Sequence, residues 1–294
     1  MFNNRLAGIS IVIYNIDIAC RENLLKQIDG FIKYGFNVVV FLNSYDPVLM
    51  ATTKVLVSHE TDFSNMGLGF AHNTNIEKLK LVGSEYFMTL DQDTIISEQC
   101  THELFMSSSK LPSMYLIGPL LVDQNFTELI SRTEKIKRLF FRKKETVDLI
   151  EVDKLIQSGM TGRISDWSIL NGFDATLFIG EVDYEYCNRL KFHGGRVFKL
   201  NKCSVVQLIG LGRVGIPHFT VALHKPIRHY YYIRNQIRLI MDGRYPTRKI
   251  FTVIVHSLAV IILSPLAGKS FYCFSAVVSG ICDGFRRIGG EKNG

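Results

Sequence analysis

The sequence has few cysteines, and none of them stand at a metal-binding spacing. Six cysteines are scattered over 294 residues without a C-x-x-C pair, which excludes the common zinc and iron–sulfur motifs. A disulfide framework would place more cysteines in a shorter chain. We therefore expect reduced, mostly buried thiols in a cytoplasmic protein.

The N-terminal segment lacks the features of a secretory signal. No charged stretch precedes its apolar run, no small-residue cleavage site follows it, and the run is short, β-branched and ends at Tyr14-Asn15. We expect a first strand here and a chain that is not exported. The composition, 47% hydrophobic and 21% charged, also excludes a disordered protein and supplies apolar side chains for a large core.

Acidic residues are fewer than basic ones, 27 against 34, and the net charge is +7 with a sequence pI of about 9.0. This excess indicates an anionic partner, such as nucleic acid, a nucleotide sugar or an acidic membrane surface. The segment Lys135–Lys144 (KIKRLFFRKK) is either a solvated helix face or a surface attracted to anionic lipid headgroups. No wider basic field or nucleic-acid-reading motif accompanies it, so we expect no nucleic-acid partner.

The N-terminal half alternates apolar runs with amphipathic segments. This alternation predicts an α/β fold with a parallel, doubly wound sheet. Ligands of such sheets bind beyond the carboxyl ends of the strands, where Asn15, Asn43 and Asp91 would lie. The expected strands are Ile9–Tyr14, Phe36–Leu42, Lys54–Val57 and Glu85–Leu90, and the expected helices are Ala19–Lys33 and one that enters from Asn65–Asn75 and runs through Leu81.

Charged residues are absent from Ile250–Gly268, and Ser270–Cys282 is a second uncharged run. Lysine and arginine residues flank both segments. The first run just reaches spanning length, but polar residues and Pro265 interrupt it. A membrane span and a buried helical hairpin are alternatives; helices that lie in the membrane interface fit the pattern best.

Asp91 and Asp93 directly follow the fourth expected strand, with one residue between them. Two carboxylates at a strand end can hold one hard cation together with substrate phosphates, an arrangement that suits Mg²⁺. The alternative is an ordinary solvated turn.

A second group of carboxylates, Glu181, Asp183 and Glu185, occupies alternate positions near an expected helix start. Acidic residues in a first helical turn can simply complement the helix dipole. The functional interpretation is a general base that deprotonates a hydroxyl nucleophile.

In this order, the motifs resemble the inverting nucleotide-sugar glycosyltransferases of family two, which have the GT-A fold, and within them the bacterial rhamnosyltransferases of O-antigen and polysaccharide biosynthesis. The resemblance covers nearly the whole chain, and LDQD and HKPIRHYYYIRN are its most specific parts. The matching segments are IVIYN (11–15), NMGLGFAHNTN (65–75), LDQD (90–93), IQSG (156–159), NGFDATLFIGEVDYEYCNR (171–189), HKPIRHYYYIRN (224–235) and SGICDGFRRIGG (279–290).

The resemblance implies roles for individual residues. Asp93 and Asp91 match the metal-binding positions, Asp183 matches the catalytic base, and Glu185 matches the second acidic position of that motif. Gly172 and Asp174 match the turn beneath the acceptor. The implied donor-binding residues are Tyr14, Asn43, Asn65, Gly67, Asn75, Asp91, Ser158, Arg228, Arg234 and Asn235.

Two positions depart from the family pattern. The family usually reads the base with an aspartate at the second strand end, where this chain has Asn43 with Asp46 nearby. The family also often has H-x-x-G after the base motif, where this chain has Gln207. If that histidine is a metal ligand elsewhere, Gln207 is a weaker one, or His218 or His224 replaces it.

The resemblance also implies an activity. We expect inverting transfer of L-rhamnose from dTDP-L-rhamnose, with Mg²⁺ or Mn²⁺, onto a glycan carried by polyprenyl diphosphate at the cytoplasmic side of the bacterial inner membrane. Residues 1–245 would form the catalytic domain and residues 246–294 a helical membrane-contacting region. The alternatives are transfer of galactofuranose, glucose or N-acetylglucosamine, and a catalytically degenerate assembly partner.

Overall fold

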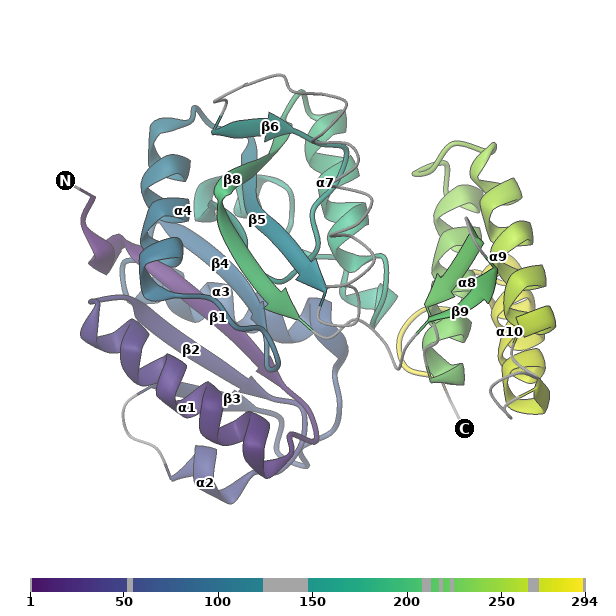
Figure 1. Ribbon diagram of the computed structural model, residues 1–294, viewed down its shortest axis with the longest axis horizontal. Coiled ribbons are helices and arrows are strands. Elements are labelled where there is room, and N and C mark those ends of the chain that lie inside the picture. The colour runs from purple at the N-terminus through teal and green to yellow at the C-terminus, as the bar shows by residue number, and fades with distance from the viewer. Residues whose placement is uncertain are drawn as a thin grey trace. The chain divides into compact units, whose positions relative to one another are not determined.

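The computed structural model describes residues 2–51, 55–123, 148–207, 213–216, 219–222, 225–263 and 270–292. The chain forms two compact units, and most of their elements are labelled in Figure 1. The sheet unit comprises Met1–Met66, Phe70–Phe173 and Tyr186–Leu208. The helical unit comprises Gly67–Gly69, Asp174–Glu185 and Ile209–Gly294. Compact units therefore do not divide at residue 245, and the functional division predicted there stays a prediction.

An eight-stranded sheet with the order β3-β2-β1-β4-β7-β5-β8-β6 forms the centre of the sheet unit. The pairs β1–β2, β1–β4, β2–β3 and β5–β8 are parallel, whereas β7 and β6 pair antiparallel with their neighbours. The strands are β1 (Ala7–Ile13), β2 (Asn37–Leu42), β3 (Leu56–His59), β4 (Tyr86–Asp91), β5 (Tyr115–Asp123), β6 (Leu149–Glu151), β7 (Met160–Arg163) and β8 (Arg196–Gln207).

The predicted α/β class is confirmed, and the four predicted strands form within two residues of their expected ends. The sheet is mixed rather than purely parallel, because the later strands β6 and β7 run against their neighbours. The α-helices of this unit are α1 (Ile18–Lys33), α2 (Pro47–Met50), α3 (Gly67–Leu81), α4 (Glu98–Lys110), α6 (Ile164–Ile169) and α7 (Val182–Phe192). The first residues of α3 and of α7 belong to the helical unit.

Strand β1 is buried on both faces. Its odd-numbered residues, including Ile9 and Ile11, join the core that α1 and α4 close with Phe31 and Leu104. The even-numbered residues face α3: a Cβ on Gly8 would lie 2.6 Å from Leu79. Continuous apolar runs are typical of strands covered by helices on both sides.

Strand β8 contains an irregularity that matters for the site. Leu200 pairs with Pro119 of β5, but the next pair joins Ser204 to Leu120, so residues 201–203 are extra on the β8 side. The part before this bulge pairs with β6, and the part after it continues along β5 to Gln207.

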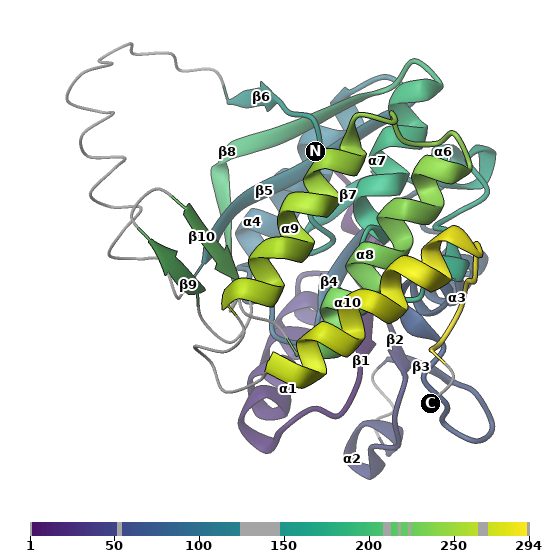
Figure 2. The ribbon, with the colours of Figure 1, turned by 90° about the vertical axis from the view of Figure 1, so that its right-hand side faces the viewer.

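Three helices pack together in the helical unit: α8 (Pro226–Met241), α9 (Lys249–Leu263) and α10 (Ser270–Phe285), seen side by side in Figure 2. Ile233 and Ile237 of α8 form a core with Val253 and Val260 of α9 and Val277 of α10. A two-stranded ribbon, β9 (Arg213–Ile216) and β10 (Phe219–Ala222), precedes them. Within the described parts of the chain, every helix is too short or too polar to cross a bilayer.

A buried polar network links β1 to α3. The His72 ring lies 2.7 Å from the Ser10 hydroxyl through Nδ1, and both residues are fully buried. Asn75 donates to the same hydroxyl at 3.0 Å. Burial lowers the pKa of His72 from 6.5 to about 4, although the charge of Asp91 opposes this shift.

We expect His72 to make folding pH-dependent. Between pH 6.5 and about 4 the unfolded chain binds a proton at this histidine and the folded chain does not. Stability therefore falls as the pH is lowered through this range, by up to about 3 kcal/mol. The His72→Gln variant, which does not titrate, should lose less stability between neutral pH and pH 4 than the wild type in urea unfolding. His193→Gln, at an exposed position, is the control; equal pH dependence in all three proteins would contradict the prediction.

Candidate functional site

Three parallel neighbours, β2, β1 and β4, end at the same edge of the sheet. Gln92, just beyond β4, ties this edge to the end of β1: its Oε1 accepts from the Tyr14 backbone N at 2.7 Å and its Nε2 donates to the Tyr14 carbonyl at 3.1 Å. The Asn15 backbone N, in the left-handed region with φ of 46°, donates to Ser44 Oγ at 2.8 Å. The predicted convergence of polar strand ends is therefore present.

Four side chains meet at this edge and are called the carboxylate cluster: Asp91, Asp93, Ser158 and Gln207. The Ser158 hydroxyl donates to Asp91 Oδ2 at 2.6 Å. Gln207 Nε2 donates to the same oxygen at 3.0 Å and to Asp93 Oδ1 at 3.3 Å. Ser158 is buried, Asp91 and Gln207 are half-buried, and Asp93 is exposed.

Backbone contacts explain why the cluster assembles. The Thr89 hydroxyl donates to the Gln157 carbonyl at 2.5 Å, and the Gly159 N donates to the Thr89 carbonyl at 2.8 Å. These bonds hold the loop with Ser158 against β4. On the other side, Ile95 and Val206 exchange two backbone hydrogen bonds of 3.0 Å, which fix the turn after Asp93 beside the end of β8.

The donor set of the cluster fits a hard divalent cation. Carboxylates, a side-chain amide oxygen and a hydroxyl are the oxygen ligands that Mg²⁺ and Mn²⁺ take in proteins. Among the described residues, no three His, Cys, Asp or Glu side chains converge, so Asp91 and Asp93 would need further oxygen ligands. Gln207 lies where the sequence placed it, against both carboxylates; His218 and His224 lie outside the described residues.

Asn43 has a different role from the predicted one. Its side chain is buried, and Oδ1 accepts from the Met66 backbone N at 3.0 Å, which holds the loop before α3. Asp46 does not replace a base-reading aspartate, because it caps α2 and forms a 2.8 Å ion pair with Arg21. Tyr14 and Asn65 remain partly accessible, and their predicted donor contacts stay predictions.

Asn75 is a packing residue rather than a donor-binding one. It is fully buried, and its Nδ2 donates to Ser10 Oγ and to the Ile11 carbonyl, both at 3.0 Å. Asn73, which the sequence analysis did not select, is partly accessible. Its amide exchanges two 2.8 Å hydrogen bonds with the Phe173 backbone. Two asparagines two residues apart on a helix point in different directions, and only the helical phase separates them.

The backbone conformation and close packing at Gly67, in the helical unit, require a glycine. Its φ is 80°, and a Cβ there would lie 2.6 Å from the Phe178 carbonyl oxygen. The Leu68 N donates to that same oxygen at 2.7 Å. The predicted glycine therefore permits a close backbone approach, and its contact with a nucleotide stays a prediction.

The two predicted catalytic carboxylates have unlike surroundings in the helical unit. Glu185 is 2% exposed and forms an ion pair with Arg244, which also pairs with Asp174 at 2.6 Å. Asp183, in the first turn of α7, is half-buried, and its Oδ1 accepts from the Tyr184 N at 2.9 Å. Glu185 is thus a structural partner of Arg244, and Asp183 is the more accessible of the two.

Asp174 is held by the same arginine, and its predicted contact with an acceptor stays a prediction. Burial acts to raise the pKa of its carboxyl, but hydrogen bonds from Thr176 and Arg244 outweigh burial and lower it. Nearby, the buried Glu181 accepts from the Tyr245 hydroxyl at 2.7 Å and from Gln236 Nε2 at 3.0 Å. Asp174, Glu181 and Glu185 are therefore engaged in holding the shape of this segment.

Arg234 and Asn235 do not have the predicted donor-binding role. Both are fully buried in the helical unit. The Arg234 guanidinium donates to the carbonyls of Leu177 and Gly290, at 2.9 and 2.6 Å. Asn235 Nδ2 donates to the carbonyls at positions 177, 179 and 180. They fix the backbone that leads into α7. Arg228 is exposed, and its predicted donor contact stays a prediction.

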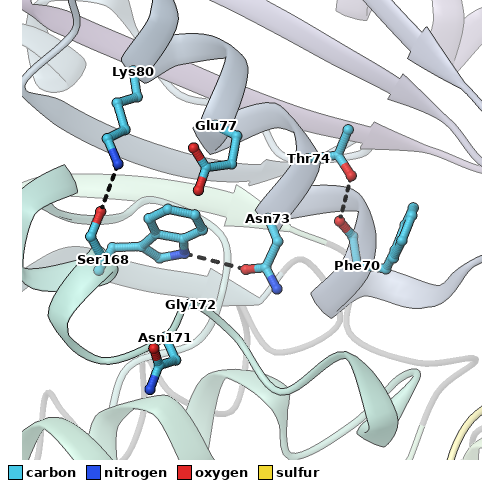
Figure 3. A pocket seen from close by; sticks show the side chains of 9 residues that line it. Phe70, Asn73, Thr74, Glu77, Lys80, Ser168, Asn171 and Gly172 are labelled. Atoms are coloured by element: carbon cyan, nitrogen blue, oxygen red, sulfur yellow. Dashed lines mark hydrogen bonds between the residues drawn. The ribbon is translucent and has the colours of Figure 1, made fainter.

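A pocket of about 580 Å³ lies in the sheet unit between α3 and the segment around α6 (Figure 3). Gly172, predicted to lie at the acceptor site, lines it with φ of 67°. Arg189 holds this glycine by donating to its carbonyl at 2.8 Å. The other lining residues are Phe70, Asn73, Thr74, Glu77, Lys80, Trp167, Ser168 and Asn171.

The sequence and the fold were compared with known proteins. No protein-family model matches the sequence. A curated relative, the dTDP-rhamnosyl transferase RfbF of Shigella flexneri, is 26% identical over 239 residues, which cover 78% of this chain and 79% of the relative.

Several solved structures share the fold at 13% sequence identity. The mannosyltransferase PcManGT from Pyrobaculum calidifontis, in complex with GDP-Man and Mn²⁺, has a TM-score of 0.55 and covers 95% of this chain and 86% of its own. Residues 1–349 of S. aureus TarS give 0.53, with coverages of 94% and 80%. GalNAc-T7 with UDP, GalNAc and Mn²⁺ gives 0.57, covering 80% of this chain and 47% of that one.

These comparisons confirm the predicted GT-A fold. They also confirm the resemblance to nucleotide-sugar-dependent glycosyltransferases of the rhamnosyltransferase type, and with it the prediction that the chain is an enzyme. The Mn²⁺ in two of the related structures agrees with a divalent cation, as the donor set of the carboxylate cluster indicates.

We expect Arg244 to be important for the stability of the helical unit. Arg244→Ala removes the cation that pairs with both Asp174 and the buried Glu185. Loss of one partner of a fully buried pair costs about 3–5 kcal/mol, and because the Arg244 side chain is 32% exposed we expect a loss below that range but above that of a surface pair. Arg287→Ala is the matched control, because Arg287 pairs with Asp242 at the surface and such pairs contribute less than about 1 kcal/mol. Chemical denaturation measures both changes, and equal losses would contradict the assignment.

Proposed function

We propose that this chain, a glycosyltransferase of the GT-A fold, transfers L-rhamnose with inversion from dTDP-L-rhamnose to a lipid-linked oligosaccharide in O-antigen or other cell-surface polysaccharide biosynthesis. The observation that carries the proposal is the carboxylate cluster at the carboxyl edge of β4 and β8. The donor sugar is supported by the relative that is a dTDP-rhamnosyl transferase.

The donor side of the proposed reaction uses the sheet unit. Asp91 and Asp93 would hold Mg²⁺ or Mn²⁺, which when bound neutralises negative charge on a leaving nucleoside diphosphate. Ser158 keeps Asp91 oriented through its 2.6 Å hydrogen bond, and Gln92 keeps the turn fixed to β1. A preorganised turn of this kind avoids reorganisation when charge develops in the transition state.

The acceptor side of the proposed reaction uses Asp183 as the general base. An inverting transfer needs one carboxylate that takes the proton of the attacking hydroxyl. Glu185 is a poor candidate, because its buried carboxylate is already paired with Arg244. Asp183 is half-buried, at the start of a helix whose first turn is fixed by that pair. No covalent enzyme intermediate is required, since positioning supplies much of the rate.

Transfer from a panel of nucleotide sugars to membrane-extracted lipid acceptor tests the proposal. We expect product from dTDP-L-rhamnose, and product only from a UDP- or GDP-sugar would overturn the assigned donor. Asp183→Asn should lower turnover by about 10²–10⁴ while donor binding persists, because an amide cannot accept the proton. Glu185→Gln should lower stability more than turnover. If Glu185→Gln lost turnover and Asp183→Asn did not, the base assignment would be wrong.

We also propose that the chain contacts the cytoplasmic side of the inner membrane peripherally, through the exposed surface of the helical unit. Helix α9 exposes a stripe of large apolar side chains at helical spacing: Phe251, Ile254, Val255, Leu258 and Ile262. Helix α10 exposes Tyr272, Phe274 and Val278. Arg248, just before α9, and Arg286 and Arg287, just after α10, are also exposed. Apolar area beside basic residues suits an anionic lipid surface. The basic segment Lys135–Lys144 lies outside the described residues.

Leu258→Glu tests this contact, since it places a charge in the middle of the α9 stripe at a position that is 53% exposed. The variant should float less with anionic liposomes, and wild-type binding should weaken at high salt because screening removes the attraction. Phe192→Glu is the control, because Phe192 is 88% exposed on a helix outside this stripe. Equal flotation of the wild type and Leu258→Glu would exclude the stripe as the lipid contact, and concentration-dependent dimerisation lost in Leu258→Glu would assign it to a second copy.

A further inference from the structure

Gln207 is the only uncharged nitrogen donor in the carboxylate cluster, and it touches each of the other three members. Its Nε2 donates to Asp91 and Asp93, and its Oε1 lies 3.0 Å from the Ser158 hydroxyl. Two carboxylates one residue apart repel each other. The two N–H groups of one amide offset that repulsion by reaching one oxygen of each.

The Ser158 hydroxyl has two acceptors and one proton. Asp91 Oδ2 at 2.6 Å and Gln207 Oε1 at 3.0 Å both face it, and it can donate fully to only one of them. A half-turn of the Gln207 amide removes this competition. The hydroxyl would then donate to Asp91 alone and accept from Nε2, while Oε1 would face the carboxylates. Ser158 therefore accommodates both orientations of the same amide.

The two orientations suit two states of the site. With Nε2 turned towards the carboxylates, the amide is a partial substitute for positive charge. With Oε1 turned towards them, it adds a third oxygen to the two carboxylates, and an N–H group no longer points at a cation. The half-turn gives up the two Nε2 hydrogen bonds to Asp91 and Asp93, so it is favourable only when a bound cation neutralises both carboxylates. Ser158 keeps a hydrogen bond to the amide in either orientation, because a hydroxyl can donate or accept.

We propose that Gln207 is the third protein ligand of the cation held by Asp91 and Asp93, and that this oxygen-only set selects Mg²⁺ over softer divalent ions. The inference rests on the proposed function, which supplies the cation. Amide and carboxylate oxygens favour Mg²⁺, whereas an imidazole nitrogen shifts preference towards transition metals. Gln207 is thus a specificity-determining residue for the metal.

The test measures metal binding rather than turnover. Mn²⁺ binding to the full-length protein with dTDP is followed by the electron paramagnetic resonance signal of free Mn²⁺, and Mg²⁺ is added as the competitor. Gln207→Leu should weaken both ions by about tenfold or more. Gln207→His should tighten Mn²⁺ relative to Mg²⁺ by about tenfold. Gln207→Glu, which keeps the oxygen ligand, should tighten Mg²⁺. Thermal unfolding of each variant checks that the fold is retained.

Asp93→Ala separates this inference from the proposed function. In one outcome, Asp93→Ala binds no more metal than dTDP does by itself, while all three Gln207 variants bind both ions within twofold of the wild type. Gln207 is then not a ligand, and only this inference fails. If Asp93→Ala binds both ions like the wild type, the cation site of the proposed function fails as well. An unchanged ratio of Mg²⁺ to Mn²⁺ affinity in Gln207→His would overturn the selectivity.

Discussion

Mutual repulsion between Asp91 and Asp93 is the constraint on which the sheet edge depends. The chain holds the two carboxylates together with neutral hydrogen-bond donors from distant parts of the sequence. Ser158 arrives on the loop before β7, and Gln207 arrives at the end of β8. Both donors are kept in place by backbone bonds to β4 and to the turn that follows it. The mixed sheet has a function here, because antiparallel β7 brings its loop back to the edge where the parallel strands end.

In the helical unit, several acidic side chains have structural partners. Arg244 neutralises Asp174 and Glu185, while Tyr245 and Gln236 donate to Glu181. Arg234 and Asn235 saturate the carbonyls just upstream of α7. These contacts hold the start of α7, where Asp183 is half-buried and more accessible than Glu185. Fixed surroundings are what a positioned base requires.

The sequence predicted the elements of the sheet edge well, because long apolar strands followed by polar residues are a local pattern. Asp91, Asp93 and Ser158 were selected and do meet, and Gln207, noted as a departure from the family pattern, joins them. Asn75 and Arg234 were assigned to the donor, yet both are buried and bind protein carbonyls. An amide or guanidinium serves a buried carbonyl as well as a ligand, and only tertiary packing distinguishes the two uses.

The same limit explains why Asn73 was missed and why the compact units differ from the predicted domains. The tie between Asn73 and Phe173 joins residues 100 positions apart, which no local pattern reveals. Likewise, α8 was grouped with the catalytic domain by its motif, but Ile233 and Ile237 form one core with α9 and α10. A sequence motif identifies candidate functional residues, but long-range packing determines which elements those residues pack against.

The bulge at residues 201–203 divides β8 into two segments with separate duties. The first segment closes the sheet against β6, and the second, from Ser204 onward, carries the bridge to Ile95 and ends in Gln207. In a regular strand, a change of register at the end that pairs with β6 would also change the register of every later residue, because each residue is paired in sequence. An irregularity between the two segments takes up such a shift locally. Insertions and deletions ahead of the bulge are therefore tolerated more easily than those behind it, and the last four residues of β8 can keep their alignment while the outer edge of the sheet diverges.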